Sequence, residues 1–263
     1  MTYFLYMDPT LRFSNRVENY VSSRPSYPEG VLDILRRETE LTPQSLVADI
    51  GSGTGLSSEL FLRNGNTVFG VEPNAEMRRT AEQQLERYPG FRSVSGSAEA
   101  TTLSARSVDH VIAGQAFHWF DPQRARDEFA RILRPGGWVA LFWNSRRLDS
   151  TPFLLAYEAL LQRFGTDYRE VQHKNVDAAR LQAFFAGEAF RRHELYNEQV
   201  FDLNGLRGRL LSSSYTPTEM HPSYRPMLRE LERIFEQHEE AGQVKFEYDV
   251  EIYTGLVAPN AAA

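Results

Sequence analysis

Residues 47–56 read Val-Ala-Asp-Ile-Gly-Ser-Gly-Thr-Gly-Leu, and this stretch decides the fold. An apolar run ends at Ile50, three glycines follow at alternate positions, and a helical pattern begins at Leu56. Glycine tolerates positive φ angles and has no Cβ, so such a loop can turn tightly and lie close to a ligand. The pattern therefore predicts a strand, a glycine-rich turn and a helix that together bind a nucleotide-like molecule, or else a tight turn without a ligand.

The sequence around this loop alternates short apolar runs with amphipathic stretches. The apolar runs predict five strands, at 46–50, 67–71, 91–94, 108–113 and 137–143. Helical patterns lie between them near 55–64, 74–88 and 122–133. Strands that alternate with helices pair in parallel through right-handed crossovers. The predicted fold class is therefore α/β, with a doubly wound and mostly parallel sheet.

The two ends of the chain follow other patterns. Residues 1–44 are predicted to form a helical cap on the core at 45–144. Beyond the core, helices are predicted at 152–164, at 174–187 and from Pro226 onward. Alternation of apolar and polar residues at 244–254, with weaker strand character at 190–201, predicts an antiparallel pair that completes a seven-stranded sheet. Residues 145–263 would then form the acceptor side of one structural domain.

The composition excludes several classes of function. The chain has 263 residues with 29 Lys and Arg against 35 Asp and Glu, a net charge of −6, which argues against a nucleic-acid partner. Without cysteine there is no disulfide, thiolate zinc site or cysteine nucleophile, and the six histidines lack the spacing of metal ligands. No apolar run approaches the roughly 20 residues of a membrane span. We expect no membrane partner, no signal peptide, a cytoplasmic location, and a monomer or homodimer.

Two carboxylates flank the glycine loop. Asp49 lies two residues before Gly51, and Glu72 follows the next predicted strand, where it can accept hydrogen bonds from both hydroxyls of an adenosine ribose. NAD would bring a doubly negative pyrophosphate to Asp49, whereas S-adenosylmethionine carries an ammonium and a sulfonium. A dinucleotide motif would also have glycine where Leu56 stands. These features favour S-adenosylmethionine and leave an NAD-dependent oxidoreductase as the alternative.

Two further segments follow predicted strands. Ser97-Ala98-Glu99 comes after the third strand, where the adenine is expected, although Glu99 could equally be a solvated loop acid. The fourth strand leads into residues 114–121, which include Phe117-His118-Trp119-Phe120. Ligands of open α/β sheets bind beyond the carboxyl ends of the strands, so this segment should face the reaction centre. The same aromatic residues could also be ordinary core.

Together these residues resemble a known family. Residues 49–55, Glu72, 97–99, 115–120 and Ile132-Leu133-Arg134-Pro135-Gly136-Gly137 look like a class I S-adenosylmethionine-dependent methyltransferase with its Rossmann-like fold. They are similar to the small-molecule branch that includes the ubiquinone-pathway and trans-aconitate methyltransferases. The segment from Phe13 to Pro28 resembles the N-terminal cap of that branch. The resemblance covers roughly residues 12–144 and says less about the remainder.

The resemblance implies S-adenosylmethionine as cofactor and a set of residues that bind it. Its methionine end would lie against the glycine loop, its ribose at Glu72, and its adenine between Met77 and the 97–99 segment. The implied set is Tyr20, Arg24, Asp49, Gly51, Ser52, Gly53, Gly55, Glu72, Pro73, Met77, Ser97, Ala98, Glu99, Gln115 and Ala116. Gln115-Ala116-Phe117-His118 stands where an Asn-Pro-Pro-Tyr-type motif would be, which argues against methylation of DNA bases or of glutamine.

The acceptor is expected to be a small molecule that attacks the methyl group in line. His118 is the candidate catalytic base, because of its position and because free histidine has a near-neutral reference pKa, or else it only packs beside Trp119. The predicted acceptor walls are Trp119, Trp143, Asn144 and Tyr215. Aromatic walls suit a flat or apolar acceptor, whereas Arg146 and Arg147 would attract a carboxylate. Methylation of oxygen, nitrogen or a carboxylate stays open, as does a non-catalytic binding module.

Overall fold

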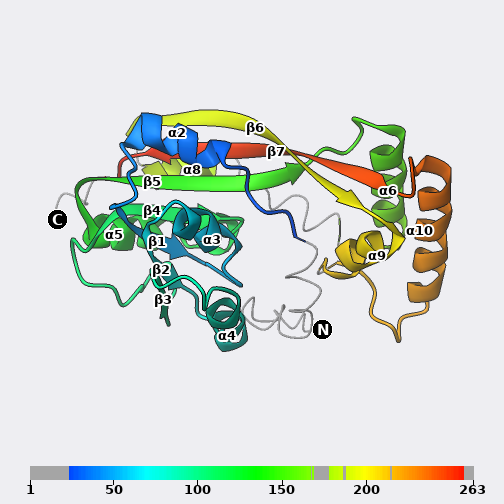
Figure 1. Ribbon diagram of the computed structural model, residues 1–263, viewed down its shortest axis with the longest axis horizontal. Coiled ribbons are helices and arrows are strands. Elements are labelled where there is room, and N and C mark those ends of the chain that lie inside the picture. Colours follow the sequence, from blue (N-terminus) through cyan, green and yellow to red (C-terminus); the bar gives the residue numbers. More distant parts are fainter. Residues whose placement is uncertain (1–23, 167, 169–177, 186–187, 214, 258–263) are drawn as a thin grey trace, which may run out of the picture.

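The computed structural model describes residues 24–166, 168, 178–185, 188–213 and 215–257. Its centre is a seven-stranded sheet in the order β3-β2-β1-β4-β5-β7-β6 (Figure 1). The strands are β1 (Leu46–Ile50), β2 (Thr67–Val71), β3 (Phe91–Val94), β4 (Val108–Gly114), β5 (Leu133–Arg146), β6 (Phe190–Phe201) and β7 (Val244–Gly255). The first five pair in parallel, and β7 is antiparallel to both β5 and β6. The predicted fold class and the antiparallel C-terminal pair are confirmed.

Helices follow most strands, as the alternating pattern predicts. They are α2 (Gly30–Thr39), α3 (Leu56–Arg63), α4 (Ala75–Gln84), α5 (Pro122–Ile132), α6 (Pro152–Phe164), α8 (Ala178–Phe185), α9 (Leu203–Leu211) and α10 (Tyr224–His238). Local chemistry sets several of their starts. The side chains of Asn74 and Asp121 accept hydrogen bonds from backbone N–H groups in the first turns of α4 and α5. Proline stands in the first turn of α5 and of α6, where its missing N–H costs little.

The two faces of the sheet are covered by different helices. Apolar side chains of α5 and α8, such as Phe129 and Phe184, pack on one face with Phe117. Helices α2 and α3 cover the other face, where Val250 and Ile252 of β7 contribute to the same cluster. The earlier half of β7 instead packs against α6, α9 and α10. One face of a single strand therefore joins the half of the sheet that carries the glycine loop to the C-terminal helices.

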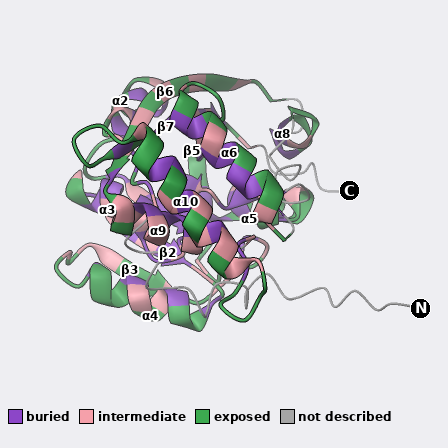
Figure 2. Ribbon diagram, turned by 90° about the vertical axis from the view of Figure 1, so that its right-hand side faces the viewer, coloured by how far each residue is buried: buried purple, intermediate pink, exposed green. Residues whose placement is uncertain are grey.

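The C-terminal helices lie beyond the carboxyl ends of the parallel strands. Arg146, the last residue of β5, pairs with Tyr248, and β7 extends from there back to Val244, which pairs with Phe201 of β6. Figure 1 shows β6 and β7 reaching past the other strands to α6, α9 and α10, with α9 nearer to the parallel strands than α10. Figure 2 looks onto this end, where buried and exposed residues alternate along α6 and α10. These helices therefore stand on the ligand-binding side of the sheet.

Some boundaries differ from those predicted. The fifth strand begins at Leu133 rather than 137, so Arg134-Pro135-Gly136-Gly137 is its first part. Helix α9 was not predicted, because Gly205 and Gly208 interrupt its apolar pattern; the side chain of Asp202 caps it by accepting from the N–H of Gly205. Residues 1–23 of the predicted cap and the two ends of the helix predicted at 174–187 lie outside the described residues, and the part of that helix between these ends is α8. None of the helices in the described ranges is long and apolar enough to cross a membrane.

Candidate active site

The three glycines of the loop have positive φ angles of 69°, 56° and 91° at Gly51, Gly53 and Gly55, but their surroundings differ. A Cβ on Gly51 would lie 2.6 Å from the Cβ of Ala116, and one on Gly55 would lie 2.6 Å from Leu85 Cδ1. A Cβ on Gly53 would meet no atom of the described residues within 4 Å. Gly51 and Gly55 are therefore required by packing, whereas Gly53 borders open space that a ligand can occupy.

The carboxylate of Glu72 is held directly beside Gly53. Its Oε2 accepts a hydrogen bond from the backbone N–H of Gly53 over 3.1 Å, and Oε1 accepts from the N–H of Asn74 over 2.9 Å. Arg78 Nη1 donates to the carbonyl oxygens of Glu72 and Pro73 and fixes the backbone there. Burial raises the pKa of Glu72, although these two N–H groups and Arg78 act in the opposite direction. The result is an oriented acceptor at the end of β2.

Asp49 is fully buried under the first turn of α3, and only half of its carboxylate is satisfied. Oδ2 accepts hydrogen bonds from the hydroxyls of Ser57 and Ser58 over 2.7 and 2.6 Å. Oδ1 is buried and has no hydrogen-bond partner among the described residues. Burial raises the pKa of Asp49 to about 6. An unpaired buried carboxylate oxygen fits the cationic end of S-adenosylmethionine, and it disfavours a pyrophosphate.

Ser57 and Ser58 were not among the predicted site residues. Two small polar residues in the first turn after a glycine loop are a weak signal, because serine is common near helix starts. Their role becomes visible only when the fold places Asp49 beneath them.

The segment expected near the adenine forms a tight turn after β3. Ser97 and Ala100 exchange backbone hydrogen bonds, and Ala98 between them is buried. Glu99 Oε1 accepts from the backbone N–H of Asp121 over 2.9 Å. Glu99 therefore joins this turn to the start of α5, and the side chain is not merely a solvated acid. Met77 of α4 is buried as well. Contacts of these residues with adenine stay a prediction.

Gln115 continues β4 in a strained conformation. Its φ is +55°, which is uncommon for a residue other than glycine and typical of functional positions. Its N–H donates to the carbonyl of Phe142, and Nε2 donates to the carbonyl of Asn144 over 3.0 Å. The next residue, Ala116, packs on Gly51. Gln115 thus connects the glycine loop to the end of β5.

The aromatic residues after β4 divide between core and surface. Phe117 is fully buried, and its ring contacts Phe184 and Trp143, so Trp143 lies mostly in the core at 9% exposure. The His118 and Trp119 rings lie 4.7 Å apart, and Trp119 is 38% exposed. Of these side chains, Trp119 has the most surface available to an acceptor. The role of His118 as a base stays a prediction.

The remaining predicted residues lie near the end of β5. Asn144 is buried, and its Oδ1 accepts from Nδ2 of Asn197 over 2.8 Å. Arg24 Nη2 donates to the carbonyl of Ser212 over 3.4 Å, so the start of the described chain reaches the C-terminal part. The ring of Tyr215 packs edge-on against Tyr168 with centroids 4.8 Å apart. Tyr20 lies outside the described residues.

A family model for a methyltransferase domain matches residues 48–141, which span the glycine loop, Glu72 and the segment after β4. Residues 48–141 are a class I, S-adenosylmethionine-dependent methyltransferase domain. The resemblance inferred from the sequence motifs is confirmed at the level of family and fold. The small-molecule branch within that family stays a prediction.

Relatives of the methyltransferase domain occur in bacteria and fungi. An uncharacterized methyltransferase of Mycobacterium tuberculosis is 39% identical over 139 residues, which cover 53% of this chain and 54% of that protein. An uncharacterized methyltransferase-like protein of Schizosaccharomyces pombe is 31% identical over 156 residues, 59% of each chain. The matched part thus spans little more than half the length of these curated relatives.

A solved structure extends the similarity of fold beyond the matched domain. A proposed type II methyltransferase from Anaeromyxobacter dehalogenans superposes with a TM-score of 0.63 at 22% identity. The superposition covers 90% of this chain and 99% of that one. The C-terminal strands and helices are therefore part of a fold that this methyltransferase domain shares with other proteins.

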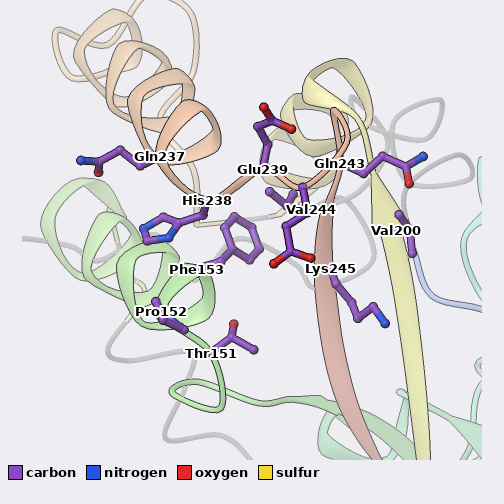
Figure 3. Close-up of a pocket in the computed structure, with 11 residues that line it drawn as sticks. Thr151, Pro152, Phe153, Val200, Gln237, His238, Glu239, Gln243, Val244 and Lys245 are labelled. Carbon is purple, nitrogen blue, oxygen red and sulfur yellow. The ribbon is translucent and has the colours of Figure 1, made fainter.

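A surface hollow of about 620 Å³ lies at the far end of the C-terminal helices (Figure 3). Phe153 of α6 and His238 of α10 lie side by side in it, with ring centroids 6.5 Å apart, and Lys245 borders it from β7. The hollow includes none of the predicted site residues. The described residues also contain no group of three histidine, aspartate or glutamate side chains placed to hold a metal ion.

Proposed function

We propose that this chain transfers the methyl group of S-adenosylmethionine to a small-molecule acceptor. One observation carries the proposal: Gly53 borders open space while its N–H orients the carboxylate of Glu72, with the unpaired Oδ1 of Asp49 in the same loop region. This arrangement combines a cradle without a Cβ, an acceptor for ribose hydroxyls and a negative charge for a cation.

Each of these residues has a distinct role in the proposal. Glu72 accepts hydrogen bonds from the ribose hydroxyls, and Asp49 attracts the cationic methionine end. Backbone groups around Gln115 close the site toward the acceptor, because Gln115 contacts both the β5 end and, through Ala116, the glycine loop. Trp119, Asn144 and Tyr215 border the acceptor side.

The chemistry requires little more than correct placement. Bound S-adenosylmethionine supplies an electrophilic methyl carbon; the acceptor's lone pair forms the new bond while the carbon–sulfur bond breaks and its electron pair stays on sulfur, leaving S-adenosylhomocysteine. Holding the two reactants close and collinear can account for much of the rate enhancement. An acceptor that carries a proton must also release it, and His118 is the proposed base for such an acceptor. An acceptor that is already anionic needs no base.

Calorimetric titration tests the proposal most directly. S-adenosylhomocysteine is expected to bind the full chain, whereas NADH at the same concentration is not. Binding of NADH without binding of S-adenosylhomocysteine would instead support the oxidoreductase alternative. Transfer of a labelled methyl group to a metabolite extract then separates an enzyme from a non-catalytic binding module. We further propose that the protein is a cytoplasmic monomer or homodimer. We also propose that it has no nucleic-acid partner, which the net charge of −6 supports.

A further inference from the structure

A buried polar cluster lies between the end of β5 and the C-terminal helices. We define the arginine–tyrosine cluster as Arg146 of β5, Tyr157 and Glu158 of α6, Tyr168, Arg209 of α9 and Tyr248 of β7. Hydrogen bonds join Arg146, Glu158 and Tyr168, and a second set joins Arg209 to Tyr248. Tyr157 lies between the two sets, because Arg146 lies over its ring and because Tyr157 and Arg209 both pack on the ring of Phe246. Charged groups are rarely buried unless they are paired, so each buried arginine of this cluster is expected to have a carboxylate partner.

The positive charge of Arg146 is balanced by the carboxylate of Glu158. Its Nη2 lies 2.5 Å from Glu158 Oε2 and also donates to the hydroxyl of Tyr168 over 3.0 Å. The Tyr168 hydroxyl donates in turn to Glu158 over 2.5 Å, and Gln162 donates to the other carboxylate oxygen. Arg146 and Glu158 therefore form a closed pair, and Glu158 has no remaining charge to offer a second arginine.

The positive charge of Arg209 is not balanced by a carboxylate of the described residues. Its side chain is buried at 6% exposure, and the groups that it contacts are neutral: the hydroxyls of Ser213 at 3.2 Å and Tyr248 at 3.5 Å, and the face of the Phe246 ring. No carboxylate lies within 4.0 Å of its guanidinium in the described parts of the chain. An arginine guanidinium keeps its proton even when it is buried, so Arg209 is charged. The cluster carries one net positive charge.

Tyr157 supplies a second, independent observation. Its ring is 1% exposed, and its hydroxyl is buried without a hydrogen-bond partner among the described residues. Arg209 and Arg146 both influence its ionisation, and Arg146 lies over its ring at 5.2 Å. A buried hydroxyl donor without an acceptor costs on the order of 1–3 kcal/mol. The ring centroids of Tyr157 and Phe246 lie 4.9 Å apart, and the Arg209 guanidinium lies 5.9 Å from the same Phe246 ring. A single carboxylate beside this ring would accept from the Tyr157 hydroxyl and pair with Arg209.

The cluster adjoins the acceptor side of the proposed active site. Arg146 lies two residues after Asn144 on β5, on the same face of the strand, and Asn144 accepts from Gln115. Ser213, which contacts Arg209, follows Ser212, the residue that Arg24 contacts. Tyr215, a predicted acceptor wall, packs on Tyr168 of the cluster. A molecule bound at Arg209 would therefore lie toward the proposed acceptor site and not beside Glu72.

From these observations we propose that the methyl acceptor carries a carboxylate, which the guanidinium of Arg209 and the hydroxyl of Tyr157 bind. The inference rests on the proposed function and names the class of acceptor. One net positive charge among aromatic rings suits a monoanionic carboxylate better than a phosphate dianion. The carboxylate anchors the acceptor at this point, so Arg209 is a substrate-binding residue and does not take part in methyl transfer.

Small carboxylates provide the probes. Acetate, hexanoate, succinate and benzoate are titrated into the full chain with S-adenosylhomocysteine present, and the midpoint of thermal unfolding is recorded. The corresponding amides and phenyl phosphate serve as neutral and dianionic controls, with sodium chloride matching ionic strength. At least one carboxylate is expected to raise the unfolding temperature, because a ligand that binds only the folded state stabilises it. The amides are expected to have no effect.

Three variants assign the binding to Arg209. Arg209→Met is expected to weaken carboxylate binding roughly 10- to 100-fold, the loss typical of a hydrogen bond to a charged group. Its affinity for S-adenosylhomocysteine should not change, and its unfolding temperature should stay equal or rise, because an unpaired buried charge is removed. Arg209→Lys should retain part of the binding. Arg207→Met is the matched control, since Arg207 lies on the same helix but pairs with Glu232 at the surface.

The outcomes separate this inference from the proposed function. If S-adenosylhomocysteine fails to bind, the proposed function is wrong. If it binds but none of the carboxylates does, or if Arg209→Met binds them like the wild type, the carboxylate inference is wrong and methyl transfer can still stand. A marked loss of stability in Arg209→Met would show that Arg209 is structural and would also overturn the inference. A preference for phenyl phosphate would do the same.

Discussion

The backbone N–H of Gly53 donates a hydrogen bond to Oε2 of Glu72 over 3.1 Å. This contact joins the glycine loop after β1 to the end of β2, so the two strongest signals in the sequence meet at one point. In the direction of a Cβ, Gly53 has no atom of the described residues within 4 Å. A ligand that enters there meets an oriented carboxylate without any rearrangement of the backbone.

Replacing Glu72 should impair the binding of the adenosine part. Glu72→Ala removes both ribose hydrogen bonds, and we expect the dissociation constant for S-adenosylhomocysteine to rise about 100-fold or more, since each bond to a charged group contributes roughly 1.5–3 kcal/mol. Titration calorimetry measures this directly. Glu76→Ala, an exposed position two residues into α4, should bind like the wild type. Wild-type affinity in Glu72→Ala would refute the ribose assignment.

The glycines should respond differently to substitution. Gly53→Val is expected to abolish binding of S-adenosylhomocysteine while the protein still folds with reduced stability. The valine side chain would meet no atom of the described residues within 4 Å, but a β-branched residue is strained at a φ of 56°. Gly51→Ala should instead destabilise the fold by about 2–4 kcal/mol, since it adds a clash with Ala116 to a positive φ. Urea unfolding and titration calorimetry on both variants separate the two effects. Full binding by Gly53→Val would show that the ligand does not approach the loop.

Asp49 should make stability depend on pH. Its folded-state pKa of about 6 lies above the ordinary 3.8, so the folded state holds this proton more tightly than the unfolded state does. The protonated Asp49 carboxyl therefore adds on the order of 3 kcal/mol to the free energy of unfolding below about pH 4. This stabilisation is lost as the pH rises through 6. Asp49→Asn should therefore be more stable than the wild type at pH 7.5, with no such advantage at pH 4. Urea unfolding of both proteins across this range measures the difference.

The same titration should act on ligand binding in the opposite direction. The proposed attraction between Asp49 and the cationic methionine end requires the ionised carboxylate, so affinity for S-adenosylmethionine should fall as the pH drops below about 6. Asp49→Asn should bind weakly at all these pH values and lose the pH dependence. An unchanged pH profile in Asp49→Asn would show that Asp49 does not contact the cation.

Local patterns in the sequence were sufficient for the strands of the core and for singling out Gly53 and Glu72, which the fold brings into contact. The strands that end at Ile50 and Val71 are short buried runs. A glycine loop, or an acidic residue at the end of a strand, can be recognised from a few neighbouring residues. The acceptor side depends on contacts distant in sequence. Ser57 and Arg209 look like ordinary helix residues until the fold places one above Asp49 and buries the other. Helix α9 escaped prediction for a similar reason, because packing against β6 and α10 stabilises a segment whose glycines disfavour a helix.

The buried pair of Arg146 and Glu158 should be important for stability, in contrast to pairs at the surface. The two side chains are 10% and 7% exposed, and Glu158→Ala would leave Arg146 buried without its partner. We expect a loss of about 3–5 kcal/mol in the free energy of unfolding. Glu230→Ala breaks the exposed pair with Arg233 and should cost less than about 1 kcal/mol. Replacing both partners, as in Arg146→Met with Glu158→Leu, should recover much of the loss, because neither buried charge remains. Urea unfolding of the four proteins tests this, and a small effect of Glu158→Ala alone would show that Arg146 finds compensation elsewhere.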